Sequence, residues 1–76
     1  MPTLKDLREE AMLSQVELAR QLAVSKQTVW EWEHAKAKPK PAHQRKLVAL
    51  YGKTPREILD AIKATQEEAK KERPAA

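Results

Sequence analysis

Two serine residues, Ser14 and Ser25, stand so close together in the chain that they restrict how two helices can meet. Ser14 opens the run SQVE, in which Glu17 completes a capping box that starts a helix. This helix is expected to extend to about Ala23, and Ser25 already caps the next one. Because hardly any residues remain for the turn, the two helices cannot lie antiparallel. They must cross steeply, which leaves the outer face of the second helix free to project.

Further helices begin at comparable signals on either side of this pair. Thr3 pairs with Asp6 as an N-terminal cap, and apolar residues follow at helical spacing. Pro39 and Pro41 end the segment before them and permit another helix, for which Gly52 is a suitable C-terminal cap. Together with the helices that start at the two serines, these signals account for four helices.

The last expected helix starts at Thr54, where Glu57 completes another capping box. Its large apolar residues are expected to be buried, namely Ile58, Leu59 and Ile62. The C-terminal run TQEEAKKERPAA contains no large apolar residue. We therefore expect a folded domain over residues 1–63 and a charged tail over residues 64–76 that is a frayed helix or disordered.

Composition supports a single all-α domain. One glycine, no phenylalanine and few β-branched residues argue against a sheet, and 76 residues are enough for one small core. The absence of cysteine excludes disulfides and thiolate metal sites. The start MPTLKDLREEAML lacks the apolar run of a signal peptide, and no stretch approaches membrane-spanning length. These features predict a cytoplasmic protein without membrane contact, which in a bacterial or phage context would be nucleoid-associated.

The positive charge is concentrated in one short segment. The formal net charge is +4, but residues 34–46 alone carry +5 from lysine and arginine side chains, with no acid among them. The five cations are Lys36, Lys38, Lys40, Arg45 and Lys46. A cationic run that is stiffened by prolines and directly follows a helix favours a segment that faces phosphates, although a simply solvated face is the alternative. Arg45 and Lys46 lie on the next expected helix and fit either interpretation.

The run SQVELARQLAVSKQTVWEWE resembles the helix-turn-helix of the phage repressor and Cro family, also called the xenobiotic-response-element family. The family pattern has a glutamine at its start, a small residue four positions later, a turn residue, and two apolar residues in the second helix of the motif. In this chain these positions hold Gln15, Ala19, Ala23, Val29 and Trp32. The flanking runs LREEAMLSQ, EHAKAKP and YGKTPREIL also fit, so that the resemblance covers residues 3–62. It implies a compact five-helix, lambda-repressor-like DNA-binding domain whose second and third helices form the helix-turn-helix.

The resemblance also implies a function. The chain would be a sequence-specific, double-stranded-DNA-binding transcriptional regulator, in the simplest case a repressor, that inserts its third helix into the major groove. A homodimer on a pseudo-palindromic operator is expected, with half-sites about one helical turn (~34 Å) apart. The alternative is an antitoxin or a small coactivator that uses the same fold as a protein-interaction module. In that case Trp30 and the charged tail would serve the protein partner.

Three positions depart from the family pattern. Ala23 and Ala35 stand where the family usually has glycine, so either these turns avoid the left-handed region or the domain carries a strain of about 1 kcal/mol at each. Gln44 stands near a position where the family usually has leucine, which makes the start of the fourth helix more polar. None of these residues belongs to the expected recognition surface.

The outward face of the third helix supplies the residues expected to read bases: Lys26, Gln27, Thr28, Trp30 and Glu31. Lys26 would donate to guanine and Gln27 would pair with adenine. Thr28 would reach a phosphate or a thymine methyl, and Glu31 would accept from cytosine or repel wrong sites. Trp30 would pack on a thymine methyl or a sugar, or else cover an apolar patch on its own domain or on a neighbour.

A second group is expected to contact DNA phosphates: Gln15, Ser25, Lys36, Lys38 and Lys40. Gln15 lies where a side-chain amide and free backbone N–H groups can bind a phosphate, although it is also an acceptable ordinary first-turn residue. The resemblance further implies that Glu33 pairs with Arg8 and braces the third helix against the first.

Neither a metal site nor catalysis is expected. His34 and His43 have no third ligand at a suitable spacing. The sequence shows no nucleophile with an associated base and no glycine-rich phosphate loop. We therefore expect a protein that is not an enzyme and that needs no cofactor.

Overall fold

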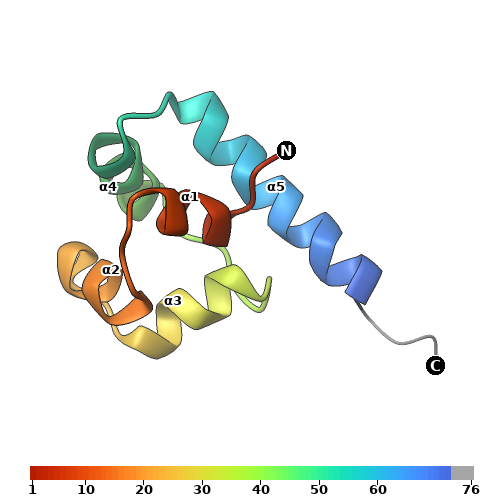
Figure 1. Cartoon of the computed structure of the whole chain (residues 1–76), viewed down its shortest axis with the longest axis horizontal. Coiled ribbons are helices and arrows are strands. Elements are labelled where there is room, and N and C mark those ends of the chain that lie inside the picture. Colours follow the sequence, from red (N-terminus) through yellow and green to blue (C-terminus); the bar gives the residue numbers. More distant parts are fainter. Residues whose placement is uncertain (73–76) are drawn as a thin grey trace.

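Residues 1–72 of the chain are described by a computed structural model, and this part is entirely helical (Figure 1). Its helices are α1 (Leu4–Glu10), α2 (Gln15–Leu22), α3 (Lys26–Glu33), α4 (Pro41–Tyr51) and α5 (Pro55–Glu72). Helix α2 packs on α3, α1 packs on both α3 and α5, and α4 packs on α5. In the view of Figure 1, α1 lies near the middle with α4 to its left and with α2 and α3 below it. The expected all-α, five-helix fold is confirmed.

Helices α1, α2, α3 and α5 begin at the side-chain caps that the sequence predicts. At the start of α2, the Glu17 N–H donates to Ser14 Oγ at 3.1 Å, and the Ser14 N–H donates to the Glu17 carboxylate at 2.8 Å. At the start of α3, the Thr28 N–H donates to Ser25 Oγ at 3.1 Å. Reciprocal capping boxes also join Thr3 with Asp6 and Thr54 with Glu57. Each cap satisfies backbone N–H groups that have no partner within the helix.

Helix α4 begins differently. Its N-cap residue, Lys40, makes no side-chain capping bond, and Pro41 occupies the first turn, where a missing N–H does no harm. The half-buried Gln44 donates from Nε2 to the carbonyl oxygen of Pro39 at 2.8 Å. A leucine at this position would leave that carbonyl without this donor. The polar residue is therefore explained by the loop that precedes the helix.

Both turn alanines adopt the left-handed conformation, with φ of 57° at Ala23 and at Ala35. Ala23 is the C-cap residue of α2, and the Val24 N–H after it donates to the carbonyl oxygen of Ala19 at 2.9 Å. Such closing bonds require a left-handed residue at the end of the helix, and glycine adopts this conformation with less strain than alanine. Of the two possibilities that the sequence left open, the strained turn is the one observed. Met12, between α1 and α2, is a third such residue, with φ of 59°.

The core lies where the helices converge. Its most completely buried large side chains are Leu22, Val29, Leu47 and Ile58. Trp32 joins them at 5% exposure, and the His43 ring packs against its indole with centroids 5.3 Å apart. The expected inner face of α3, formed by Val29 and Trp32, is thus buried.

Helix α5 continues past the expected domain boundary after residue 63. Ala64 and Thr65 are both buried, and the Thr65 hydroxyl accepts a 2.9 Å hydrogen bond from the Leu4 N–H while donating to the Ala61 carbonyl oxygen at 2.8 Å. The first turn of α1 therefore obtains its acceptor from the segment that we expected to be a tail. Residues 73–76 of that segment lie outside the described residues.

One expectation about α5 was wrong. Ile58 and Ile62 are buried as expected, but Leu59 is 49% exposed. Residues 58 and 62 lie on the same face of a helix, whereas residue 59 is turned about 100° away from residue 58. The face of α5 that is buried is therefore narrower than the set of its apolar residues, and Leu59 lies outside the buried face.

We expect Ala23→Gly and Ala35→Gly each to stabilise the domain by about 1 kcal/mol, because glycine removes the left-handed strain. In a domain of this size, thermal unfolding should shift upward by about 4–8 °C for each substitution. Ala49→Gly is the matched control, since Ala49 is exposed within α4. It should destabilise by about 1 kcal/mol. A loss of stability in the two turn variants would show that these turns carry no relievable strain.

Candidate nucleic-acid interface

Helix α3 has one buried face and one exposed face. Val29 is fully buried and Trp32 is 5% exposed, whereas Lys26, Gln27 and Trp30 are all exposed. Lys26 and Trp30 are four residues apart and therefore lie on one side of the helix, with Gln27 beside them. These three side chains line a small open hollow on the outer face of α3. The structure thus brings together three of the five residues expected to read bases.

The other two base-reading candidates are placed less freely. Thr28 is half-buried, and its hydroxyl lies 2.9 Å from Ser25 Oγ, so that one hydroxyl donates to the other. Thr28 and Ser25, the latter expected at a phosphate, therefore form the helix cap together. Glu31 is half-buried at the flank of the exposed face, and its backbone carbonyl oxygen accepts from the Lys36 N–H at 2.8 Å.

Trp30 stacks on His34, one helical turn further along. The two ring centroids are 4.1 Å apart with an interplanar angle of 19°, and His34 Nδ1 lies 2.9 Å from the Trp30 carbonyl oxygen. The indole remains 37% exposed and does not belong to the core cluster. Sequence reasoning considered His34 only as a metal ligand. Its spacing of four residues from an outward-facing tryptophan was the signal that could have placed it on this face.

The lysine-rich loop follows α3 directly. Lys36, Lys38 and Lys40 are exposed, whereas Pro39 between them is buried. The buried proline holds the loop against the domain while the alternating lysines project into solvent. The three cations are therefore exposed in the segment that directly follows α3, as a segment that binds phosphates requires.

An ion pair braces α3 against α1. Arg8 Nε lies 2.6 Å from one Glu33 carboxylate oxygen and Nη2 lies 3.1 Å from the other, while Nη1 donates to the Leu13 carbonyl oxygen at 2.9 Å. The side chains of Arg8 and Glu33 are 11% and 3% exposed. The hydrogen bond to Glu33 raises the pKa of Arg8 even though burial acts in the opposite direction, so the guanidinium remains charged.

Gln15 takes part in the same network. Its Nε2 donates to Glu33 Oε1 at 3.0 Å, so the half-buried amide is directed into the domain. This differs from the outward orientation that a phosphate-binding side chain needs. Sequence reasoning missed the contact because Gln15 and Glu33 lie on different helices, 18 residues apart.

Within residues 1–72, no three His, Cys, Asp or Glu residues are grouped closely enough to hold a metal ion. Each of the two histidine rings packs on a tryptophan, His34 on Trp30 and His43 on Trp32. In the same described part, no helix has both the length and the apolar character that crossing a membrane requires.

Glu33→Leu should destabilise the domain by about 3–5 kcal/mol, because it leaves the charged Arg8 buried without its partner. The double variant Arg8→Met with Glu33→Leu should recover part of this loss, as unfolding in urea would measure. Glu10→Ala is the control, since Glu10 forms only an exposed 4.0 Å pair with Lys53. Equal effects of Glu33→Leu and Glu10→Ala would contradict a structural role for the buried pair.

Comparison with known proteins places this geometry in a family. Residues 3–69 match the family described as a helix-turn-helix domain, so that the match covers nearly all of the chain. Neither an individual curated protein nor a solved structure gives a significant match. The match includes α2 and α3, the turn between them and the lysine-rich loop. The chain therefore belongs to the helix-turn-helix domain family.

Proposed function

We propose that the protein is a sequence-specific, double-stranded-DNA-binding transcriptional regulator that inserts α3 into the major groove. The observation that carries this proposal is the joint exposure of Lys26, Gln27 and Trp30 on the outer face of a helix whose inner face is buried. Membership of the helix-turn-helix family supports it, because such domains place their second motif helix in the groove and typically lack catalytic activity.

One set of side chains contacts base edges and a second set contacts phosphates. Lys26 donates to guanine O6 and N7, and Gln27 forms the bidentate pair with adenine N6 and N7. Glu31, at the flank, accepts from cytosine N4 or repels incorrect sequences. Lys36, Lys38 and Lys40 neutralise phosphates and set the register of the domain on the duplex.

The side chains of Ser25, Thr28 and Gln15, also expected at the DNA, make hydrogen bonds within the domain. Ser25 and Thr28 lie at the N-terminus of α3, close enough to the groove to meet a phosphate once the helix is inserted. Gln15 reaches a phosphate only through its backbone N–H at the start of α2 or after a change of rotamer, since its amide is bonded to Glu33. The simplest regulatory mechanism is repression, in which the bound domain blocks access of RNA polymerase to a promoter.

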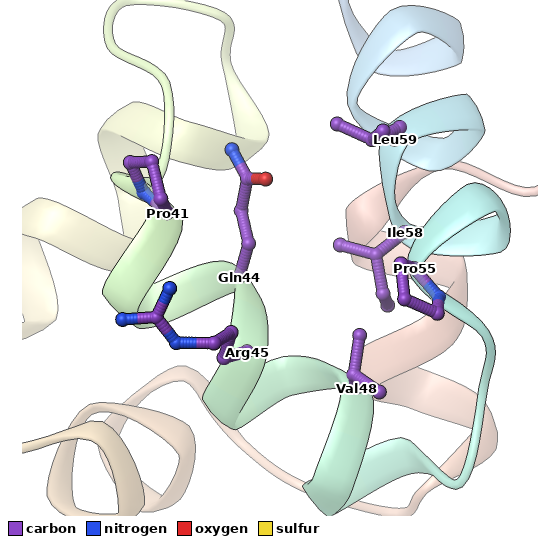
Figure 2. A pocket seen from close by; sticks show the side chains of 7 residues that line it. All are labelled: Pro41, Gln44, Arg45, Val48, Pro55, Ile58 and Leu59. Atoms are coloured by element: carbon purple, nitrogen blue, oxygen red, sulfur yellow. The ribbon is translucent and has the colours of Figure 1, made fainter.

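A second surface, lined by residues of α4 and α5 and by none of α3, is suited to self-association. Residues of α4 and α5 form a groove, and their side chains face each other across it (Figure 2). Its lining is mainly apolar and consists of Pro41, Gln44, Arg45, Val48, Pro55, Ile58 and Leu59. The half-exposed Leu59 lies at the edge of this same surface.

We infer that a second copy of the chain occupies this groove in a homodimer bound to a pseudo-palindromic operator. A two-fold interface must present the same patch on both copies and must be complementary to itself. The α4–α5 surface meets this condition because it offers both an apolar slot and an exposed apolar side chain, Leu59, which can enter the slot of the partner. The half-sites would then be about one helical turn (~34 Å) apart.

Substitutions should separate base-reading residues from phosphate-binding ones. Gln27→Ala should weaken binding to the preferred site by about 1–3 kcal/mol and relax specificity at one base pair. Lys38→Ala should weaken binding to all sequences about equally and reduce the salt slope of log affinity by about 0.9. Selection from random DNA followed by titrations at several salt concentrations measures both effects. Lys63→Ala, on α5, is the control and should change neither; identical behaviour of the first two variants would contradict the assignment.

Leu59→Glu should abolish self-association, because it places a charge in the apolar interface. Sedimentation at micromolar concentration should show a smaller species than the wild type, and binding should weaken on DNA with two half-sites but not on one half-site. Met12→Glu makes the same chemical change at an 88% exposed position outside the groove and serves as the control. A wild type that binds the two half-sites independently would contradict the dimer.

A further inference from the structure

The outer face of α3 contains one apolar surface among polar side chains. Trp30 is the large hydrophobic residue exposed on this face, and its ring forms one wall of the hollow that Lys26 and Gln27 complete. A cation, an amide and an aromatic wall therefore meet at one place. An indole in this setting is suited to contact an apolar group of a ligand that also carries hydrogen-bonding groups close by.

The indole is held in place before any ligand binds. The His34 ring covers it at a centroid distance of 4.1 Å, and the 2.9 Å contact between His34 Nδ1 and the Trp30 carbonyl oxygen fixes the imidazole at the end of α3. His34 is the C-cap residue of the helix, so its backbone is also fixed. A side chain that is already ordered loses less entropy when it makes a contact.

The major groove of DNA offers one apolar group for such a wall. This group is the C5-methyl of thymine, which lies on the same groove edge as the N6 and N7 atoms of the paired adenine. Gln27 and Trp30 are three residues apart, which is about 4.5 Å along the helix axis. Since successive base pairs are about 3.4 Å apart, the two side chains reach the same base pair or adjacent ones.

We propose that the hollow lined by Lys26, Gln27 and Trp30 reads a pyrimidine C5-methyl group in the major groove, and that His34 is the positioning residue that holds the indole for this contact. The proposal rests on the function proposed above. The methyl group can belong to thymine or to 5-methylcytosine, which share this chemistry. His34 acts through Trp30 and needs no contact with a base of its own.

The test replaces single thymines by deoxyuridine, which removes only the methyl group. Within a site selected from random DNA, each such replacement is titrated with the wild type and with Trp30→Ala at fixed salt. At one position in each half-site, the wild type should lose roughly fourfold in affinity, the value of one buried methyl group. Trp30→Ala should show no loss at that position. Trp30→Leu keeps an apolar side chain and should retain part of the discrimination.

A second arm places cytosine or 5-methylcytosine at the same position, opposite guanine. A gain on methylation with the wild type that is absent in Trp30→Ala identifies the methyl group itself as the ligand. Lys63→Ala is the matched control and should discriminate between thymine and uracil as the wild type does.

The role of His34 is tested by rescue. His34→Ala should reduce the preference for thymine over uracil, and His34→Phe should restore most of it, because phenylalanine keeps the stacked ring without the nitrogen contact. Quenching of tryptophan fluorescence by iodide provides an independent readout. Trp32 is buried, so an increased quenched fraction in His34→Ala reports on Trp30 alone.

The outcomes separate this proposal from the one it rests on. Failure to enrich any sequence from random DNA would overturn both. Enrichment of a site at which every uracil replacement affects the wild type and Trp30→Ala equally would overturn methyl recognition only. In that case the indole would contact a sugar or a phosphate, or a protein partner, and DNA binding would stand.

Discussion

The carboxylate of Glu33 is the group on which the arrangement of the first three helices depends. Arg8 from α1 and Gln15 from α2 both donate to it, and Glu33 itself lies at the end of α3. A carboxylate that is only 3% exposed is costly unless its partners are in place. The helices therefore settle in the orientation that satisfies it. That orientation turns the face bearing Lys26 and Trp30 outward.

The same pairing also shapes the charge of the candidate surface. Glu33 is neutralised inside the domain by Arg8, so its negative charge does not oppose the lysines that follow α3. The buried Pro39 holds the loop that carries these lysines against the domain. The proposed phosphate-binding loop and the proposed base-reading face thus both adjoin the end of α3 that the Arg8–Glu33 pair holds in place. The loop would bind DNA by charge, whereas the face would bind by shape and hydrogen bonding.

Much of the candidate site could be predicted because it depends on helical spacing. Residues two positions apart on a helix are turned by about 200° from each other and lie on opposite faces. Trp32 could therefore be assigned to the buried face and Trp30 to the exposed face. The positions of Gln15 and His34 could not be predicted in this way. Gln15 is directed inward by an acceptor on another helix, and the His34 ring is placed by a stack and by a backbone carbonyl.

The sequence by itself determined where the helices begin and which face of α3 is apolar, because a capping box joins residues only three apart and burial repeats with the helical period. Only the tertiary structure decided what lies between distant segments. Thr65 accepts from the N–H of Leu4, 61 residues away, and makes the supposed tail part of the fold. Leu59 is left exposed because the helices around α5 cover a narrower stripe than its apolar residues span. Such contacts depend on how the helices pack against one another in space. A pattern of residues that are close in sequence does not specify this packing.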